Sequence, residues 1–67
     1  MTIDTPHFTN RELQVLMFVK QGLTNKQIAL LLGVKPVTVE FHLSNLYKKL
    51  NVSTRAEAVL QAEKIGI

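Results

Sequence analysis

The chain has 67 residues, enough for one small domain, and a domain of this size buries only about 60% of the surface that its unfolded chain exposes. A core this small leaves little room for a large catalytic cleft, and the absence of cysteine excludes a disulfide framework or a thiolate metal site. The longest apolar run, residues 28–32, is far shorter than the roughly 20 residues of a membrane span, and Asp4 and Pro6 do not fit a signal peptide. We therefore expect a cytoplasmic protein without a membrane partner.

The formal net charge is +3, and the excess is confined to one segment. Residues 24–50 hold four lysines and one glutamate, whereas the four cations and four anions elsewhere in the chain balance one another. A positive segment can offset phosphates and release their counterions, so the charge favours a nucleic-acid partner. The alternative is an ordinary solvated surface.

The beginning of the chain shows no periodic apolar pattern. We expect a leader over residues 1–8 that is flexible or clamped only at Phe8, followed by one domain over residues 9–65. The first helix should start after Thr9, because Thr9 and Glu12 have the spacing of a capping box, and it should end at Gly22. Its expected core stripe comprises Leu13, Val15, Leu16 and Val19.

A second capping box, Thr24 with Gln27, predicts a second helix that ends at Gly33. The small Ala29 suits a close crossing of two helices, and the flexible Gly33 suits a tight turn between them. Residues 25–44 therefore have the outline of a helix-turn-helix.

The third and fourth helices complete the expected fold. The third spans residues 36–50, with Pro36 in its first turn, Asn51 as its C-terminal cap and a core stripe of Val39, Leu43, Leu46 and Leu50. The fourth begins at Ser53 or at Thr54, and its apolar residues surround nearly the whole helix: Ala56, Ala58, Val59, Leu60 and Ala62. The sequence predicts an all-α, four-helix bundle-like domain that contains a helix-turn-helix.

The third helix keeps a mixed face opposite its core stripe. A helical projection places there Val37, Phe41, Ser44 and Lys48, with Glu40 and Asn45 beside them. In a major groove, Phe41 and Val37 can touch thymine methyl groups, and Glu40 can accept a hydrogen bond from a cytosine amino group. The alternative is that Phe41 packs beneath a neighbouring chain or another domain.

Polar and positive groups flank this face, as contacts to a DNA backbone require. Along one edge of the third helix they are Thr38, His42, Asn45 and Lys49. At the N-terminus of the second helix, where free amides and the helix dipole attract anions, they are Thr24, Asn25 and Lys26. Two of these residues have other possible roles, since Thr24 can act as a cap and His42 can be a packed histidine.

The sequence offers no pattern for metal binding or catalysis. The two histidines, His7 and His42, stand far apart, and the chain has no cysteine and no paired carboxylates. Neither Ser44 nor Ser53 has an evident histidine and acid in relay, and no glycine-rich phosphate loop occurs. We expect no cofactor, no metal and no enzymatic activity.

Four motifs then occur in order: T-N-R-E-L-Q-V-L, G-L-T-N-K-Q-I-A, T-V-E-F-H-L-S-N-L-Y-K-K-L and V-S-T-R-A-E-A-V. From Thr9 to Val59 they resemble the LuxR/GerE-type DNA-binding domain of bacterial transcription regulators. The resemblance implies a third helix in the major groove, a charged pair of Glu12 with Arg55, and a homodimer through the fourth helix. Such a dimer would explain the apolar surface of the fourth helix, which includes Ala58, Val59 and Ala62.

The resemblance also assigns the contacts to DNA. It places base contacts on Glu40, Phe41 and Ser44, and backbone contacts on Thr24, Asn25, Lys26, Thr38, His42 and either Lys48 or Lys49. This chain departs from the family pattern around the start of the third helix, where it has Lys35 and Val37. The backbone anchor therefore moves to Lys35, and the base preference cannot be copied from relatives.

We thus predict a bacterial regulator that binds duplex DNA at specific sequences, in the nucleoid. The alternative is a protein-interaction module that uses the same helices without binding DNA. Leu30 projects away from Ile28, and three alternatives stay open for it: a surface for RNA polymerase, a surface for a receiver domain, or no partner at all.

Overall fold

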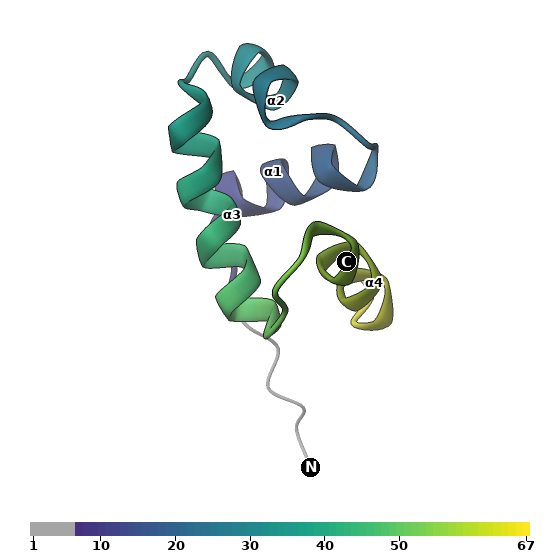
Figure 1. Ribbon diagram of the computed structural model, residues 1–67. Coiled ribbons are helices and arrows are strands. Elements are labelled where there is room, and N and C mark those ends of the chain that lie inside the picture. The colour runs from purple at the N-terminus through teal and green to yellow at the C-terminus, as the bar shows by residue number, and fades with distance from the viewer. Residues whose placement is uncertain (1–6) are drawn as a thin grey trace.

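The described part of the chain folds into four helices joined by short turns. The computed structural model describes residues 7–67, so most of the predicted leader, residues 1–6, lies outside it. The helices are α1 (Asn10–Lys20), α2 (Asn25–Leu32), α3 (Pro36–Leu50) and α4 (Arg55–Lys64). The prediction of an all-α fold with four helices is confirmed (Figure 1).

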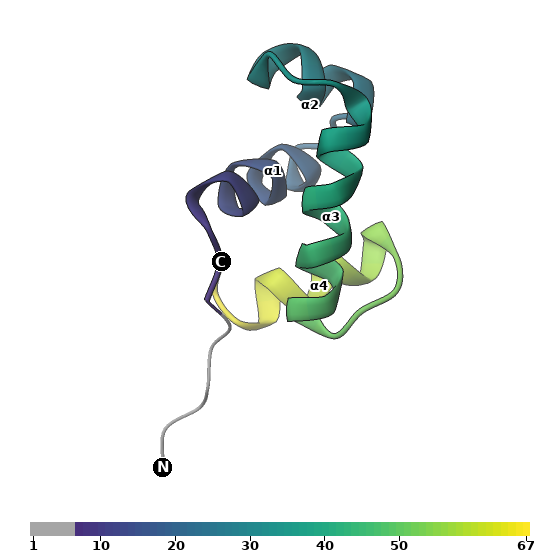
Figure 2. The same ribbon diagram turned by 90° about the vertical axis from the view of Figure 1, so that its left-hand side faces the viewer.

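The longest helix, α3, organises the domain. It packs against α1, α2 and α4, and α1 also packs against α4. Two perpendicular views show α2 across the N-terminal end of α3, α1 beside its middle and α4 beside its C-terminal end (Figure 1, Figure 2). The opposite side of α3 is therefore left without a partner helix.

The starts of α1 and α2 are fixed by local hydrogen bonds that the sequence predicted. Thr9 and Glu12 form a reciprocal capping box at α1, and Thr24 and Gln27 form another at α2. α3 starts at Pro36 without a side-chain capping bond, and the start of α4 has a pattern of its own. At α4 the Thr54 hydroxyl accepts from the Glu57 amide, but the Glu57 carboxylate accepts from the amide of Ser53.

The turn between α2 and α3 requires a left-handed residue. Gly33 supplies it with φ 68° and ψ 34°, and the following amide of Val34 donates to the carbonyl of Ala29 at 3.0 Å. This pairing satisfies a carbonyl at the end of α2 and aims the chain into α3. Pro36 is the first residue of α3, and Asn51 ends it in the left-handed conformation with φ 57°.

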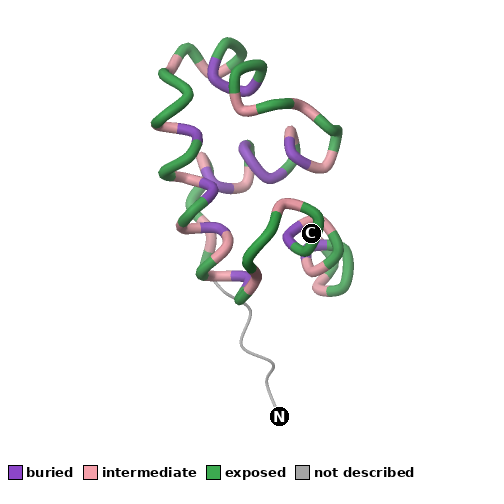
Figure 3. Tube along the Cα trace, viewed as in Figure 1, coloured by how far each residue is buried: buried purple, intermediate pink, exposed green. Residues whose placement is uncertain are grey.

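The core forms where the apolar stripes of the helices meet (Figure 3). Its members are buried and come from all four helices: Val15, Leu16, Val19, Ile28, Ala29, Val39, Leu43, Leu46 and Ala62. Phe8, the one residue at which the leader was expected to be clamped, is partly buried against this core.

Candidate nucleic-acid interface

The unpartnered side of α3 carries the residues that the sequence assigned to base contacts. Val37, Glu40, Phe41 and Ser44 are all exposed, because the core stripe of α3 occupies its other side (Figure 3). Val37 and Phe41 are each 63% exposed. Large apolar side chains in water on a mixed polar surface are typical of an interaction site.

An aromatic contact lies at the edge of the exposed face of α3. The rings of Phe41 and His42 meet edge to face, with their centroids 5.7 Å apart. His42 is half-buried, as are Thr38 and Asn45, so these three border the face rather than stand at its centre. This placement agrees with their expected position beside the base-contacting residues.

The start of α2 combines a cap with exposed positive charge. The Thr24 hydroxyl accepts from the amide of Gln27 at 3.2 Å, so its capping role is confirmed. Lys26 is exposed in the same turn. Lys35, just before α3, and Lys48, on α3, are exposed as well. Within residues 7–67 the structure gives these three lysines no ion pair, and their charges face solvent.

Lys49 differs from the other lysines of the helix-turn-helix segment, because it forms an ion pair within the domain. Its Nζ lies 2.5 Å from Oε1 of the buried Glu12 and 5.9 Å from the centroid of the Phe8 ring. Burial would raise the pKa of the Glu12 carboxyl, but hydrogen bonds from Lys49 and Thr9 and the charge of Lys49 outweigh it and lower that pKa. Lys49 thus holds α3 to α1.

The predicted pair of Glu12 with Arg55 is wrong. Arg55 instead donates to the carbonyl of Leu23 at 3.0 Å and to Oδ1 of Asn25. The two residues have different partners because different helix ends meet. Glu12 lies beside the end of α3, where Lys49 reaches it, whereas Arg55 at the start of α4 reaches the loop before α2. Arg55 therefore positions the α2 N-terminus.

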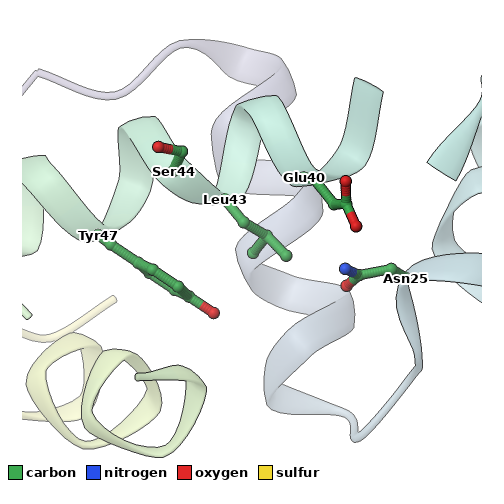
Figure 4. A pocket seen from close by; sticks show the side chains of 5 residues that line it. All are labelled: Asn25, Glu40, Leu43, Ser44 and Tyr47. Carbon is green, nitrogen blue, oxygen red and sulfur yellow. The ribbon is translucent and has the colours of Figure 1, made fainter. Parts of the chain in front are cut away.

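A cleft of about 250 Å³ adjoins the base-contacting face (Figure 4). It is lined by Asn25, Glu40, Leu43, Ser44 and Tyr47. Sequence reasoning missed Tyr47 in this group, although its positions three after Ser44 and four after Leu43 place it on the same side of the helix. In Figure 4 the Glu40 and Asn25 side chains point toward one another across the cleft.

A second apolar surface lies on the outside of α2. Leu30 is 75% exposed and Leu31 is 62% exposed, and together with Leu23 and Gln27 they line a shallow groove. The predicted outward projection of Leu30 is confirmed.

Two of the residues expected at a dimer contact are inside the domain. Ala58 and Ala62 are buried against the core of their own chain, so their expected place on the dimer surface is wrong. The cause is that α3 and α1 both pack on α4, and small side chains allow this close approach. Val59 is partly buried, and Leu60 is the large exposed apolar residue of α4.

Neither a metal-ligand cluster nor a membrane-spanning helix occurs in the part of the chain that the structure describes. Among residues 7–67, histidine, aspartate and glutamate side chains nowhere gather in a group of three that could ligate a metal ion. In the same part of the chain, every helix is too short or too polar to cross a bilayer.

Comparison with known proteins decides the family. The family model described as "Bacterial regulatory proteins, luxR family" matches residues 6–62, which is most of the chain. The chain belongs to the luxR family. It is a helix-turn-helix domain of a family of bacterial DNA-binding transcription regulators.

Similar sequences are regulators of much greater length. The HTH-type transcriptional regulator MalT of Vibrio campbellii is 43% identical over 63 residues, and that of Yersinia pestis is 46% identical over 63 residues. Each match covers 94% of this chain and 7% of the relative. The luxR-family chain thus corresponds to a small part of these proteins.

Solved structures show the same arrangement of helices. A chain in the crystal structure of the anti-activator RapF complexed with the response regulator ComA DNA-binding domain matches with a TM-score of 0.82 and 40% identity, over 85% of this chain and 98% of that one. A chain of the phage VqmA-DPO complex matches with a TM-score of 0.86 and 33% identity, over 91% of this chain and 28% of that one. These two solved structures therefore resemble the luxR-family domain in both sequence and fold.

Proposed function

We propose that this luxR-family domain binds duplex DNA at specific sequences and regulates transcription, with α3 lying in the major groove. The observation that carries the proposal is the unpartnered face of α3, where Val37 and Phe41 are exposed among polar groups. A major groove admits an α-helix and offers both methyl groups and hydrogen-bonding base edges to such a face.

Four residues on this face would read bases. Phe41 and Val37 would contact thymine methyl groups, Glu40 would accept from a cytosine amino group, and Ser44 would hydrogen-bond to either kind of edge. All four are exposed in the free domain, so binding would not require them to leave the core.

The phosphate contacts would come from both helices of the motif. The exposed Lys26, Lys35 and Lys48 would supply charge, and polar groups would fix the register: Thr24, Asn25, Thr38, His42 and Asn45. We leave out Lys49, because its ammonium group is engaged by Glu12.

We also propose that the domain binds as a homodimer through α4, on a site with two-fold symmetry. With Ala58 and Ala62 buried, the contact would have to use the accessible side of α4, where Val59 and Leu60 lie. Equilibrium sedimentation of the wild type and of Leu60→Glu tests this. Unchanged association of the variant would contradict the contact.

The rival function is a protein-interaction module, and the exposed Leu30 and Leu31 on α2 favour it. The two functions differ in their response to salt. Neutralising several phosphates makes DNA affinity fall steeply between about 50 and 200 mM salt, whereas an apolar contact hardly responds. Titration of the domain against mixed duplex DNA at both salt concentrations tests the proposal, and undetectable binding at low salt would overturn it.

A further inference from the structure

Asn25 stands between the fourth helix and the base-contacting face. Its Oδ1 accepts a hydrogen bond from the Arg55 guanidinium at the start of α4. Because a guanidinium only donates hydrogen bonds, the Asn25 atom that faces it must be the oxygen. Arg55 therefore fixes which way round the Asn25 amide lies.

This orientation leaves the amide nitrogen of Asn25 as a donor at the cleft beside α3. Glu40 is the only charged residue among those that line the cleft, and its carboxylate points toward Asn25 (Figure 4). A donor held by one helix thus faces an acceptor on the next. Glu40 is otherwise exposed, and a free glutamate side chain can adopt many rotamers.

We propose that Asn25, held by Arg55, is a positioning residue that orients the Glu40 carboxylate and thereby sets the base preference at one position of the DNA site. This inference rests on the proposed function. A carboxylate has two oxygens, so one can accept from Asn25 while the other accepts from a cytosine amino group. Restricting Glu40 beforehand lowers the entropy lost on binding.

Two substitutions of Asn25 separate orientation from charge. Asn25→Asp keeps an oxygen for Arg55 but replaces the donor that faces Glu40 by a second negative oxygen. Asn25→Ala removes the donor without adding charge. Asn10→Asp is a matched control, because Asn10 is also the first residue of a helix after a capping threonine, and an acid in a first turn is favourable in both helices.

The experiment selects bound duplexes from a library of random sequence and reads the base preference at every position. Glu40→Ala first identifies the position that Glu40 reads. Both Asn25 variants should weaken discrimination at that same position by about tenfold, because the Glu40 carboxylate loses the amide donor that faces it across the cleft. Combining Asn25→Asp with Glu40→Ala should add nothing to the change from Glu40→Ala, and Asn10→Asp should leave the preference intact.

The possible failures are distinguishable. If the Asn25 variants lose affinity uniformly while every base preference persists, or if they change other positions, the positioning role is overturned and Asn25 serves only the DNA backbone. If the wild-type domain enriches no sequence at all, sequence-specific binding is overturned, and the inference falls with it. Thermal unfolding of each variant, followed by circular dichroism, shows that the changes arise in folded protein.

Discussion

Replacing Lys49 by Met tests whether the ion pair with Glu12 holds the two central helices together. Glu12 is buried on α1, and the Lys49 side chain on α3 is 32% exposed. The substitution keeps an apolar stem of similar length but leaves the Glu12 carboxylate without its charged partner. The Thr9 amide, 2.9 Å from Oε1, still donates to it.

The expected loss follows from this partial burial. Removing one partner of a fully buried pair costs about 3–5 kcal/mol, whereas exposed pairs are worth about 1 kcal/mol or less. Lys49 lies between these limits, and its contact with the Phe8 ring adds about 0.5 kcal/mol. We expect Lys49→Met to lower the free energy of unfolding by about 2 kcal/mol, a large share of the roughly 3–10 kcal/mol typical of a chain this long.

The loss should depend on pH in one direction. The pKa of the Glu12 carboxyl is lowered in the folded domain, so the stabilisation is fully present above the ordinary value of 4.5. It is lost as the pH falls through the folded pKa, because the neutral carboxyl no longer attracts the ammonium group. The difference between wild type and variant should therefore be largest at about pH 7 and smaller at about pH 2.5.

Urea unfolding at both pH values measures these differences. Lys48→Met is a matched control, since Lys48 is the exposed neighbour and makes no ion pair within residues 7–67. It should change the stability little at either pH. Equal stability of the wild type and Lys49→Met at neutral pH, or a deficit that does not change with pH, would refute the reasoning.

Three further substitutions test the site and the turn. Lys26→Ala should weaken binding to all duplexes alike and reduce the slope of log affinity against log salt by about one unit, and an unchanged slope would contradict the phosphate contact. Phe41→Ala should lower affinity for the specific site by about 1–3 kcal/mol in competition titrations, and an equal loss on random DNA would contradict base readout. Gly33→Ala should lower the stability by about 1 kcal/mol in urea unfolding, because φ is 68° and a new Cβ would meet no atom within 4 Å, so only backbone strain remains. A stability equal to that of the wild type would show that this strain is negligible.

The position of the exposed face of α3 could be predicted because helical periodicity fixes it. Val39, Leu43, Leu46 and Leu50 must share one side of α3, so Phe41 had to lie on another. The pairing of charges could not be predicted in this way. Glu12 and Lys49 are 37 residues apart in the chain, and their contact depends on which helix ends meet.

The prediction that Ala58 and Ala62 lie on a dimer surface failed for a related reason. An apolar helix such as α4 can bury small residues in its own domain or against another chain, and composition does not distinguish the two. Ala58 and Ala62 became core residues because α1 and α3 approach α4 from the same side.

By itself, the sequence determined the helices, their caps, the left-handed turn at Gly33 and the family, because these follow from hydrogen bonds and periodicities within a few residues and from ordered motifs. Tertiary structure decided which side chains act together. It paired Lys49 with Glu12, joined Arg55 to Asn25 and turned Glu40 toward the same cleft. Such pairings depend on how helices cross in space, and no local pattern encodes the crossing.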